Sequence, residues 1–299
     1  MDTNKKYISI DIGGTAIKHG LLSSEGSILS HGETPSEANL GATHLLERVA
    51  QIVEGYIAEE SIGGICISTA GVVDPETGTI IHANSNIPGY SGTGVKAYFE
   101  KRFNLPTEVE NDARAAGLSE ACVGAAKDAS VAVCITIGTG VGGAVIVDKQ
   151  VFHGAGNFAG EIGYMGMFDS DFERSGSTTA LVDSVAKAKG LNAADLDGIA
   201  VFEMAKQGDS DANMAIEELC RKIAYGIANI AYVVNPDIVV LSGGVVKQWP
   251  LLYPLIKEKL ALYLVPRMLD ALKLEAAVNG NKAGMLGAFW HFNNKRSIG

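Results

Sequence analysis

Residues 11–15 read DIGGT and residues 136–143 read TIGTGVGG, and each stretch closes an apolar, strand-like run with a glycine-rich turn. A second strand-like run follows each turn, so the order strand, glycine turn, strand occurs twice in the chain. One half of the fold is therefore predicted to recur in the other. The strands around the two turns are predicted at 7–11, 17–22, 131–137 and 143–147.

Length and charge narrow the class of protein. A chain of 299 residues is long enough for about two domains of roughly 150 residues each. Its 24 Lys and Arg against 34 Asp and Glu give a net charge of −10 without a basic cluster, which argues against a nucleic-acid partner. We find no signal-peptide pattern and no apolar run near the roughly 20 residues that span a bilayer. We therefore expect a cytoplasmic protein with no membrane partner.

The cysteines and histidines give no metal site. Six histidines are scattered along the chain, and no Cys or His pair has the spacing of zinc ligands or of a Ser-His-Asp site. We expect the cysteines to be reduced. They are Cys66, Cys122, Cys134 and Cys220.

The rest of the sequence alternates helical and strand patterns. Apolar spacing of three and four residues predicts a helix over 43–59, and Asn235-Pro236 ends a long amphipathic helix. We place an N-terminal lobe at 1–112 and a C-terminal lobe at 113–282, and expect the last helix, about 283–299, to pack back onto the first lobe. Other strands are predicted at 64–68, 107–110 and 238–241, and a loop at 70–94. Other helices are predicted at 95–102, 216–234 and 283–292, together with one that begins near residues 111–112.

Glycine-rich turns of this kind have two interpretations. Without Cβ atoms, successive backbone N–H groups are able to approach a phosphate, whereas the plain alternative is a tight turn that needs positive φ. Two such turns, together with Gly243-Gly244 after a third strand, favour phosphate binding. Gly138, Gly140 and Gly143 also satisfy the dinucleotide pattern G-x-G-x-x-G, but a strand follows where that motif needs a helix, which argues against a dehydrogenase. No P-loop motif occurs.

Polar residues beside the first turn are candidates for the chemistry of phosphate. Asp11 ends the first strand and is suited to hold a hydrated Mg²⁺, or else to hydrogen-bond its own turn. Thr15 offers a hydroxyl to phosphate or to the turn. We expect Lys18 to be solvated.

Further polar residues follow the strand at 107–110. Asp112 is either the N-cap of the next helix or a carboxylate that accepts the proton of an attacking hydroxyl. Glu161 is either a ligand for a polyol hydroxyl or an ordinary residue of a surface loop, and Asn86 is either a hydrogen-bond donor to a ligand or a turn residue.

In combination, these motifs resemble those of the ROK family (repressors, open reading frames and sugar kinases), over nearly the whole chain. The resemblance implies a two-lobed α/β fold of the actin-like and hexokinase-like ATPases (ribonuclease H-like), with the active site in the cleft between the lobes. It implies transfer of phosphate from ATP, with Mg²⁺, to a sugar hydroxyl, and it makes a homodimer possible. E-N-D at 110–112 is similar to the family motif whose aspartate is the catalytic base.

The resemblance assigns roles to individual residues. Asp112 is implied as the base. The sugar is implied to contact Gly71, Asn86, Asn111, Asp112 and Glu161. The first phosphate loop is implied to use Asp11, Gly13, Gly14 and Thr15, the second Thr136, Gly138, Thr139 and Gly140, and the adenosine side Gly243 and Gly244.

Two departures from the family pattern bear on the substrate. Tyr164 stands where family members commonly have histidine, and residues 165–180 contain none of the cysteines of the family's zinc motif. Zinc is therefore not expected, and the usual contacts to the C1 and C2 side of the sugar are in doubt. These features resemble the zinc-free branch of the family, which includes bacterial N-acetylmannosamine kinases and β-glucoside kinases. The alternatives are a hexose kinase with glucokinase-like or fructokinase-like activity and a catalytically silent sugar-binding or regulatory protein. Only ten residues precede Asp11, so we do not expect the DNA-binding segment of the family's repressors.

Overall fold

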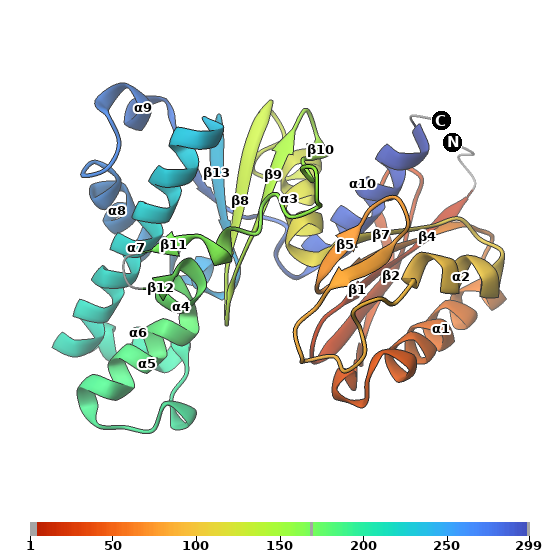
Figure 1. The fold of residues 1–299 in the computed structure, drawn as a ribbon, viewed down its shortest axis with the longest axis horizontal. Helices are drawn as coiled ribbons and strands as arrows, with labels where there is room; N and C mark the ends of the chain where they lie inside the picture. The colour runs from red at the N-terminus through yellow and green to blue at the C-terminus, as the bar shows by residue number, and fades with distance from the viewer. Residues whose placement is uncertain (1–4, 168–169, 298–299) are drawn as a thin grey trace. The chain divides into compact units, whose positions relative to one another are not determined.

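The computed structural model describes residues 5–167 and 170–297. The chain divides into two compact units, whose elements are drawn in Figure 1. Unit 1 contains Met1–Gly124, Lys149–Ala159 and Asn281–Gly299, and unit 2 contains Ala125–Asp148 and Gly160–Gly280. The lobe boundary after residue 112 stays a prediction; the first compact unit extends beyond it and includes two later segments.

The sheet of unit 1 has the strand order β3-β2-β1-β4-β7. β1 and β2 form the predicted hairpin around residues 13–15, while β4 and β7 continue the sheet as parallel strands. Parallel neighbours end at the same edge of a sheet, so the last residues of β1, β4 and β7 lie together. The strands are β1 (Lys6–Ile12), β2 (Ala16–Leu22), β3 (Ile28–Pro35), β4 (Ile62–Thr69) and β7 (Thr107–Asn111).

Helices cover both faces of this sheet. Because successive strand side chains point to opposite faces, Ile8 and Ile10 pack with Leu45 of α1, whereas Tyr7 packs with Phe289 of α10. Burial of each large apolar side chain stabilises the unit by about 1.5–3 kcal/mol. The helices are α1 (Ala42–Glu59), α2 (Val95–Phe103), α3 (Asp112–Val123) and α10 (Ala283–Ser297).

Glycines allow α10 to approach the rest of unit 1 closely. A Cβ atom on Gly287 would lie 1.7 Å from the carbonyl oxygen of Ala115 in α3, and one on Gly64 would lie 2.3 Å from the ring of Phe292. A larger side chain at either position would push the helix away. α10 is thus part of the same core as the first strands of the chain.

Unit 2 contains a second sheet, in which β9, β8, β13 and β14 follow one another in that order. β8 and β9 form the second predicted hairpin, and β13 and β14 continue the sheet parallel to β8. The longest helix, α7, ends at Asn235 in the left-handed conformation (φ 49°), directly before Pro236. The strands are β8 (Val131–Ile137), β9 (Val141–Val147), β13 (Ile238–Ser242) and β14 (Lys273–Ala276), whereas the two residues of β10 (Gln150–Val151) belong to unit 1.

The helices of unit 2 pack around a core built from both sheet and helix residues. Phe172 is fully buried, and a Cβ atom on Gly226 of α7 would lie 2.6 Å from its ring, so α7 needs glycine there. The helices are α4 (Phe172–Gly176), α5 (Thr178–Lys189), α6 (Gly198–Lys206), α7 (Ser210–Val234), α8 (Trp249–Leu260) and α9 (Pro266–Ala271).

The predicted loop at 70–94 is wrong in part. It contains the hairpin β5 (Val72–Asp74) and β6 (Thr79–His82), in unit 1. These strands are only three and four residues long and their register shifts, so no alternating pattern of useful length appears in the sequence. In unit 2, β11 (Gly166–Met167) and β12 (Ser170–Asp171) are shorter still.

Two further expectations concern the whole chain. The four cysteines are free; three are buried and Cys122 is half-buried. Within residues 5–167 and 170–297, none of the helices combines the length and the apolar character that crossing a bilayer requires.

Candidate active site

In unit 1, the ends of three parallel strands bring polar side chains together. The register places Asp11 of β1 opposite Ser68 of β4, and Thr69 of β4 opposite Asn111 of β7. Asp112 follows as the first residue of α3. Asp11 and Asp112, two of the acidic residues singled out in the sequence, therefore lie at the same edge of one sheet.

Asp11 is held by three elements. Its Oδ1 accepts a hydrogen bond from the Ser68 hydroxyl (2.8 Å), and the Lys18 ammonium lies 3.9 Å from Oδ2. A Cβ atom on Gly284 of α10 would lie 2.3 Å from the carboxyl carbon, so only glycine lets the helix pass there. Burial raises the pKa of Asp11, although Ser68 and Lys18 oppose the shift. Lys18 is ion-paired rather than merely solvated, because the hairpin register places it opposite Asp11.

Asn111, and not Asp112, is the N-cap of α3. Its side-chain oxygen accepts from the N–H of Arg114 (3.0 Å), and its amide nitrogen donates to the Gly71 carbonyl oxygen (2.9 Å) and to Oδ1 of Asp112 (3.0 Å). The Asp112 carboxylate is exposed and also accepts from the N–H of Ala113 (2.8 Å). The interpretation of Asp112 as an N-cap is therefore wrong.

A buried hydroxyl pair lies beside this edge. The hydroxyl groups of Thr69 and Tyr90 are 2.7 Å apart. Burial raises the pKa of Tyr90 to about 12, and the charge of Asp112 acts in the same direction. The Tyr90 phenol therefore stays protonated near neutral pH. Sequence reasoning missed this pair, because nothing local connects a tyrosine in a loop with the last residue of β4.

Gly71 and Asn86, both expected near a sugar, differ in their surroundings. Gly71 has φ +96°, and a Cβ atom there would lie 2.8 Å from the His82 carbonyl oxygen, so the position needs glycine. Its carbonyl oxygen is fixed by Asn111. Asn86 is exposed, and its N–H donates to Oδ1 of Asn84 (3.2 Å).

The first glycine turn is oriented by Ser36. Gly13 closes the turn by donating to the carbonyl oxygen of Ala16 (2.9 Å). The Ser36 hydroxyl donates to the Gly14 carbonyl oxygen (2.8 Å), and the Ser36 N–H donates to that of Thr15 (3.0 Å). In a planar trans peptide the C=O and N–H point in opposite directions, so the Thr15 N–H points away from Ser36.

The second glycine turn is oriented in the same way by α5. The carbonyl oxygen of Gly138 accepts from the N–H of Thr178 (2.8 Å), and that of Thr139 accepts from the Thr179 hydroxyl (2.7 Å). The N–H groups of Thr139 and Gly140 therefore point away from α5, as an anion-binding turn requires.

Glu173 of α4 completes this turn and was not foreseen. Its carboxylate accepts from the N–H of Val141 (3.1 Å), and a Cβ atom on Gly140 would lie 2.3 Å from its Oε2. The carboxylate thus fixes the end of the turn where β9 begins.

The third glycine motif lies beside the second turn. β13 runs parallel to β8, and the hydroxyl groups of Thr136 and Ser242 are 2.8 Å apart. Gly243 has φ +90°, and a Cβ atom there would lie 2.2 Å from the Ile137 carbonyl oxygen, whereas Gly244 faces open space. Two motifs about 100 residues apart in the sequence therefore share one edge of the sheet in unit 2.

The turn that carries Glu161 packs on β9 of the same unit. A Cβ atom on Gly163 would lie 2.4 Å from the Val141 carbonyl oxygen, and one on Gly143 would lie 2.6 Å from the Ile162 side chain. Glu161 is half-buried, and Tyr164 is 69% exposed. Tyr164 thus presents a large aromatic surface to solvent where the family commonly has histidine.

No group of three or more His, Cys, Asp or Glu side chains within the described residues is arranged to hold a metal ion. The expectation that zinc is not needed stays a prediction. Asp11 is a single carboxylate, and that fits Mg²⁺, which proteins commonly hold through one or two carboxylates together with substrate phosphates and water.

Comparison with known proteins agrees with this arrangement. A sequence profile of the ROK family matches residues 7–295. The chain belongs to the ROK family. This ROK protein is 30% identical to the β-glucoside kinase of Klebsiella pneumoniae over 297 residues, which cover 96% of each chain.

Two solved structures carry the same fold. A Listeria monocytogenes protein with a proposed N-acetylmannosamine kinase activity has 27% identity and a TM-score of 0.88, covering 97% of this chain and 99% of that one. A ROK glucokinase of Streptomyces griseus, in complex with glucose and AMPPNP, has 28% identity and a TM-score of 0.80, covering 95% and 97%. The family and the actin-like, hexokinase-like fold expected from the sequence are confirmed, and the named relatives are carbohydrate kinases.

Proposed function

We propose that this ROK protein is an ATP-dependent sugar kinase that phosphorylates the primary, 6-hydroxyl of a hexose, with Asp112 as its base. The observation that carries the proposal is the division of labour at residues 111–112. Asn111 caps α3, so the exposed carboxylate of Asp112 at the end of β7 is not needed for that purpose. A carboxylate at the edge of a parallel sheet is suited to accept the proton of a bound hydroxyl.

The proposed reaction needs one proton transfer and one displacement. The sugar O6 loses its proton to the Asp112 carboxylate and forms a bond to the γ-phosphorus of ATP, while the bond to the bridging oxygen breaks and ADP leaves. Asn111 donates to Oδ1 of Asp112 and so orients the accepting carboxylate. Most of the rate is expected to come from alignment and charge stabilisation, because phosphoryl transfer asks little covalent chemistry of the protein.

The glycine turns are the proposed phosphate contacts. In unit 2, Thr139 and Gly140 direct their N–H groups away from α5, and in unit 1 Thr15 directs its N–H away from Ser36. Gly243 and Gly244 would bind on the adenosine side of the nucleotide. Asp11 would hold Mg²⁺, which supplies charge neutralisation to the phosphates when bound.

The proposed sugar is N-acetylmannosamine or a β-glucoside. Support comes from Tyr164, which is exposed where the family has histidine, and from the β-glucoside kinase and Listeria relatives. A missing contact to the C1 or C2 side leaves room for an aglycone or an acylamino group. Gly71, Asn86, Asn111 and Glu161 are the other proposed sugar contacts. The second candidate is a plain hexose such as glucose, favoured by the glucose complex of the Streptomyces relative.

The test is ADP release with Mg-ATP across N-acetylmannosamine, cellobiose, glucose, mannose and fructose. We expect turnover on one of the first two that survives zinc chelation. Asp112→Asn should lower kcat by about 10²–10⁴-fold while sugar binding, measured by calorimetry, is retained. Asp128→Asn, at an exposed aspartate, is the matched control.

Each outcome bears on a different part of the proposal. Turnover like that of the unmodified protein in Asp112→Asn would remove Asp112 as the base. Turnover on glucose or fructose alone would favour the second candidate. Silence on every sugar despite ATP binding would indicate a sugar-binding protein without kinase activity.

A further inference from the structure

The carboxylate of Glu110 is fully buried, and the proposed reaction does not use it. It lies in β7, two residues before Asp112. Its Oε1 accepts from the backbone N–H of Asn111 (2.8 Å). Its Oε2 accepts from Nε2 of His153 (2.6 Å) and lies 3.3 Å from Nδ1 of His291. A buried carboxylate is costly unless it is hydrogen-bonded, so these groups determine whether the Glu110 charge is tolerated.

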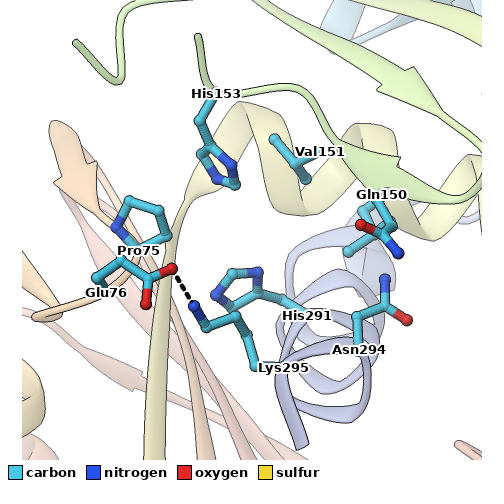
Figure 2. Close-up of a pocket in the computed structure, with 9 residues that line it drawn as sticks. Pro75, Glu76, Gln150, Val151, His153, His291, Asn294 and Lys295 are labelled. Atoms are coloured by element: carbon cyan, nitrogen blue, oxygen red, sulfur yellow. Dashed lines mark hydrogen bonds and ion pairs between the residues drawn. The ribbon is translucent and has the colours of Figure 1, made fainter. Parts of the chain in front are cut away.

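The two histidines come from different parts of unit 1 and line one cavity. His153 follows β10, and His291 belongs to α10; their rings meet edge to face with centroids 6.3 Å apart. Both imidazoles line a cavity of about 330 Å³. Figure 2 shows them together with the ion pair of Lys295 and Glu76, residues that line the same cavity. The side chain of His153 is 20% exposed and that of His291 is 5% exposed. His153 therefore lies between Glu110 and the solvent.

The charges around the cluster favour an ionised Glu110. Burial opposes ionisation, but His291, His153 and the Asn111 N–H together lower the pKa of Glu110. Burial lowers the pKa of His291, although the charge of Glu110 opposes that shift. Nη1 of the positively charged Arg114 lies 3.9 Å from Oε1 of Glu110.

The side chain of Arg114 holds the loop that carries His153. Arg114 of α3 is fully buried and donates through Nη2 to the carbonyl oxygens of Asn157 (2.7 Å) and Ala159 (3.3 Å). His153 thus approaches Glu110 from a loop held to the helix that starts at Asp112. This makes the contact a fixed part of unit 1.

A continuous set of contacts runs from His153 to Asp112. His153 binds one oxygen of Glu110, the other oxygen binds the Asn111 backbone, and the Asn111 side chain binds Asp112. We propose that His153 is a positioning residue: by holding Glu110, it fixes Asn111 and so the orientation of the Asp112 carboxylate. This inference rests on the proposed function, in which Asp112 is the base.

The experiment compares two amide substitutions at one position. In His153→Gln the side-chain amide nitrogen lies near the position of Nε2 and still donates to Glu110. In His153→Asn the amide nitrogen lies near the position of Nδ1, and the side chain is too short to reach Glu110. We expect His153→Asn to lower kcat by roughly five- to twentyfold, with the KM for ATP unchanged, because a small misorientation of a reacting group is costly. His153→Gln should stay within about twofold of the unmodified protein. His31→Asn, at an exposed histidine of β3, is the control.

A pH profile separates positioning from general damage. The Asn111 amide favours the charged form of Asp112, so a weakened contact should move the acid limb of kcat to higher pH in His153→Asn but not in His153→Gln. An unchanged kcat and an unchanged acid limb in His153→Asn would overturn the proposal while leaving the kinase function intact. Equal losses in both variants would also overturn it, by indicating a general packing role. Absence of turnover in the unmodified protein would overturn the proposed function as well, whereas turnover that Asp112→Asn abolishes and His153→Asn leaves unchanged would overturn the positioning role alone.

Discussion

The two sheets follow one plan but carry different chemistry at the same place. In each, the hairpin (β1-β2 or β8-β9) is continued by two parallel strands, and a residue near the end of the first hairpin strand lies opposite a residue near the end of the adjacent parallel strand, β4 or β13. In unit 1 the facing pair is Asp11 with Ser68, and in unit 2 it is Thr136 with Ser242; both pairs are joined by a hydrogen bond of 2.8 Å. The backbone is repeated, whereas a charged acceptor in one sheet is replaced by a neutral hydroxyl in the other.

This difference indicates how work is divided between the units. Burial raises the pKa of Asp11, so unit 1 keeps a carboxylate at a cost in stability. The hydroxyl pair of unit 2 carries no such cost. A charged group that destabilises one copy, where the other copy has a neutral hydroxyl, is consistent with the proposed role of Asp11 in holding Mg²⁺.

The sharpest test of this comparison is Asp11→Asn. We expect turnover to fall by roughly 10²-fold or more, because the charge proposed to hold Mg²⁺ at the phosphates is lost. The free energy of unfolding should rise near pH 7, since a carboxylate whose pKa is raised in the folded state opposes folding above its ordinary value of 3.8. Kinetics and thermal melting measure the two effects. A variant that is both inactive and less stable would contradict this account of Asp11.

The next effect concerns Gly243, which directly follows β13 in the sheet of unit 2. Gly243→Ala should destabilise the protein by about 2–4 kcal/mol, because its φ is positive and the added carbon would meet the Ile137 carbonyl oxygen. Gly244→Ala, at the neighbouring position with open space, should change stability by less than about 0.5 kcal/mol. Urea unfolding of both variants checks the pair, and similar losses would show that the close approach is not what matters.

A smaller effect is expected for Thr136→Val. Removing the hydroxyl leaves Ser242 without that partner and should cost about 1 kcal/mol. The sign is opposite to that expected for Asp11→Asn, so the two substitutions at equivalent positions form a direct test of the comparison. A gain in melting temperature for Thr136→Val would break it.

The last prediction concerns the stability of unit 1 at acidic pH. Burial lowers the pKa of His291 in the folded protein. As the pH falls below the ordinary value of 6.5, His291 is therefore protonated in the unfolded chain before it is protonated in the folded protein, and the free energy of unfolding decreases. The contribution of Glu110, whose pKa is also lowered, is lost at still lower pH. Hydrogen exchange between pH 7 and 5 should therefore show earlier loosening around β7 and α10 of unit 1 than in unit 2. Uniform behaviour of the two units would contradict this.

The hairpins were predictable because local signals agreed. Strand alternation and glycine turns placed both hairpins correctly, and the spacing of Leu45 to Tyr56 placed a helix that the structure has at Ala42–Glu59. The repeated plan of the two halves followed from two short motifs. Each of these features depends on neighbouring residues alone.

The contacts of the site were less predictable because they join distant residues. Glu110 meets His153 and His291, which appeared in the sequence only as scattered histidines. The pairing of Lys18 with Asp11 depends on hairpin register, and the cap of α3 falls on Asn111 rather than on its acidic neighbour. Such details depend on tertiary packing or on a shift of one residue, neither of which periodicity resolves.

The contact between Gly284 and Asp11 has a consequence for synthesis on the ribosome. The sheet that carries Asp11 lacks α10, and with it Phe289 and Phe292, until the whole of unit 2 has been translated. Unit 2 is continuous apart from the short excursion at residues 149–159, so it is able to collect its own core first. The strands that are translated first would then be completed last, and the surroundings of the Asp11 carboxylate would be among the last parts of the molecule to form.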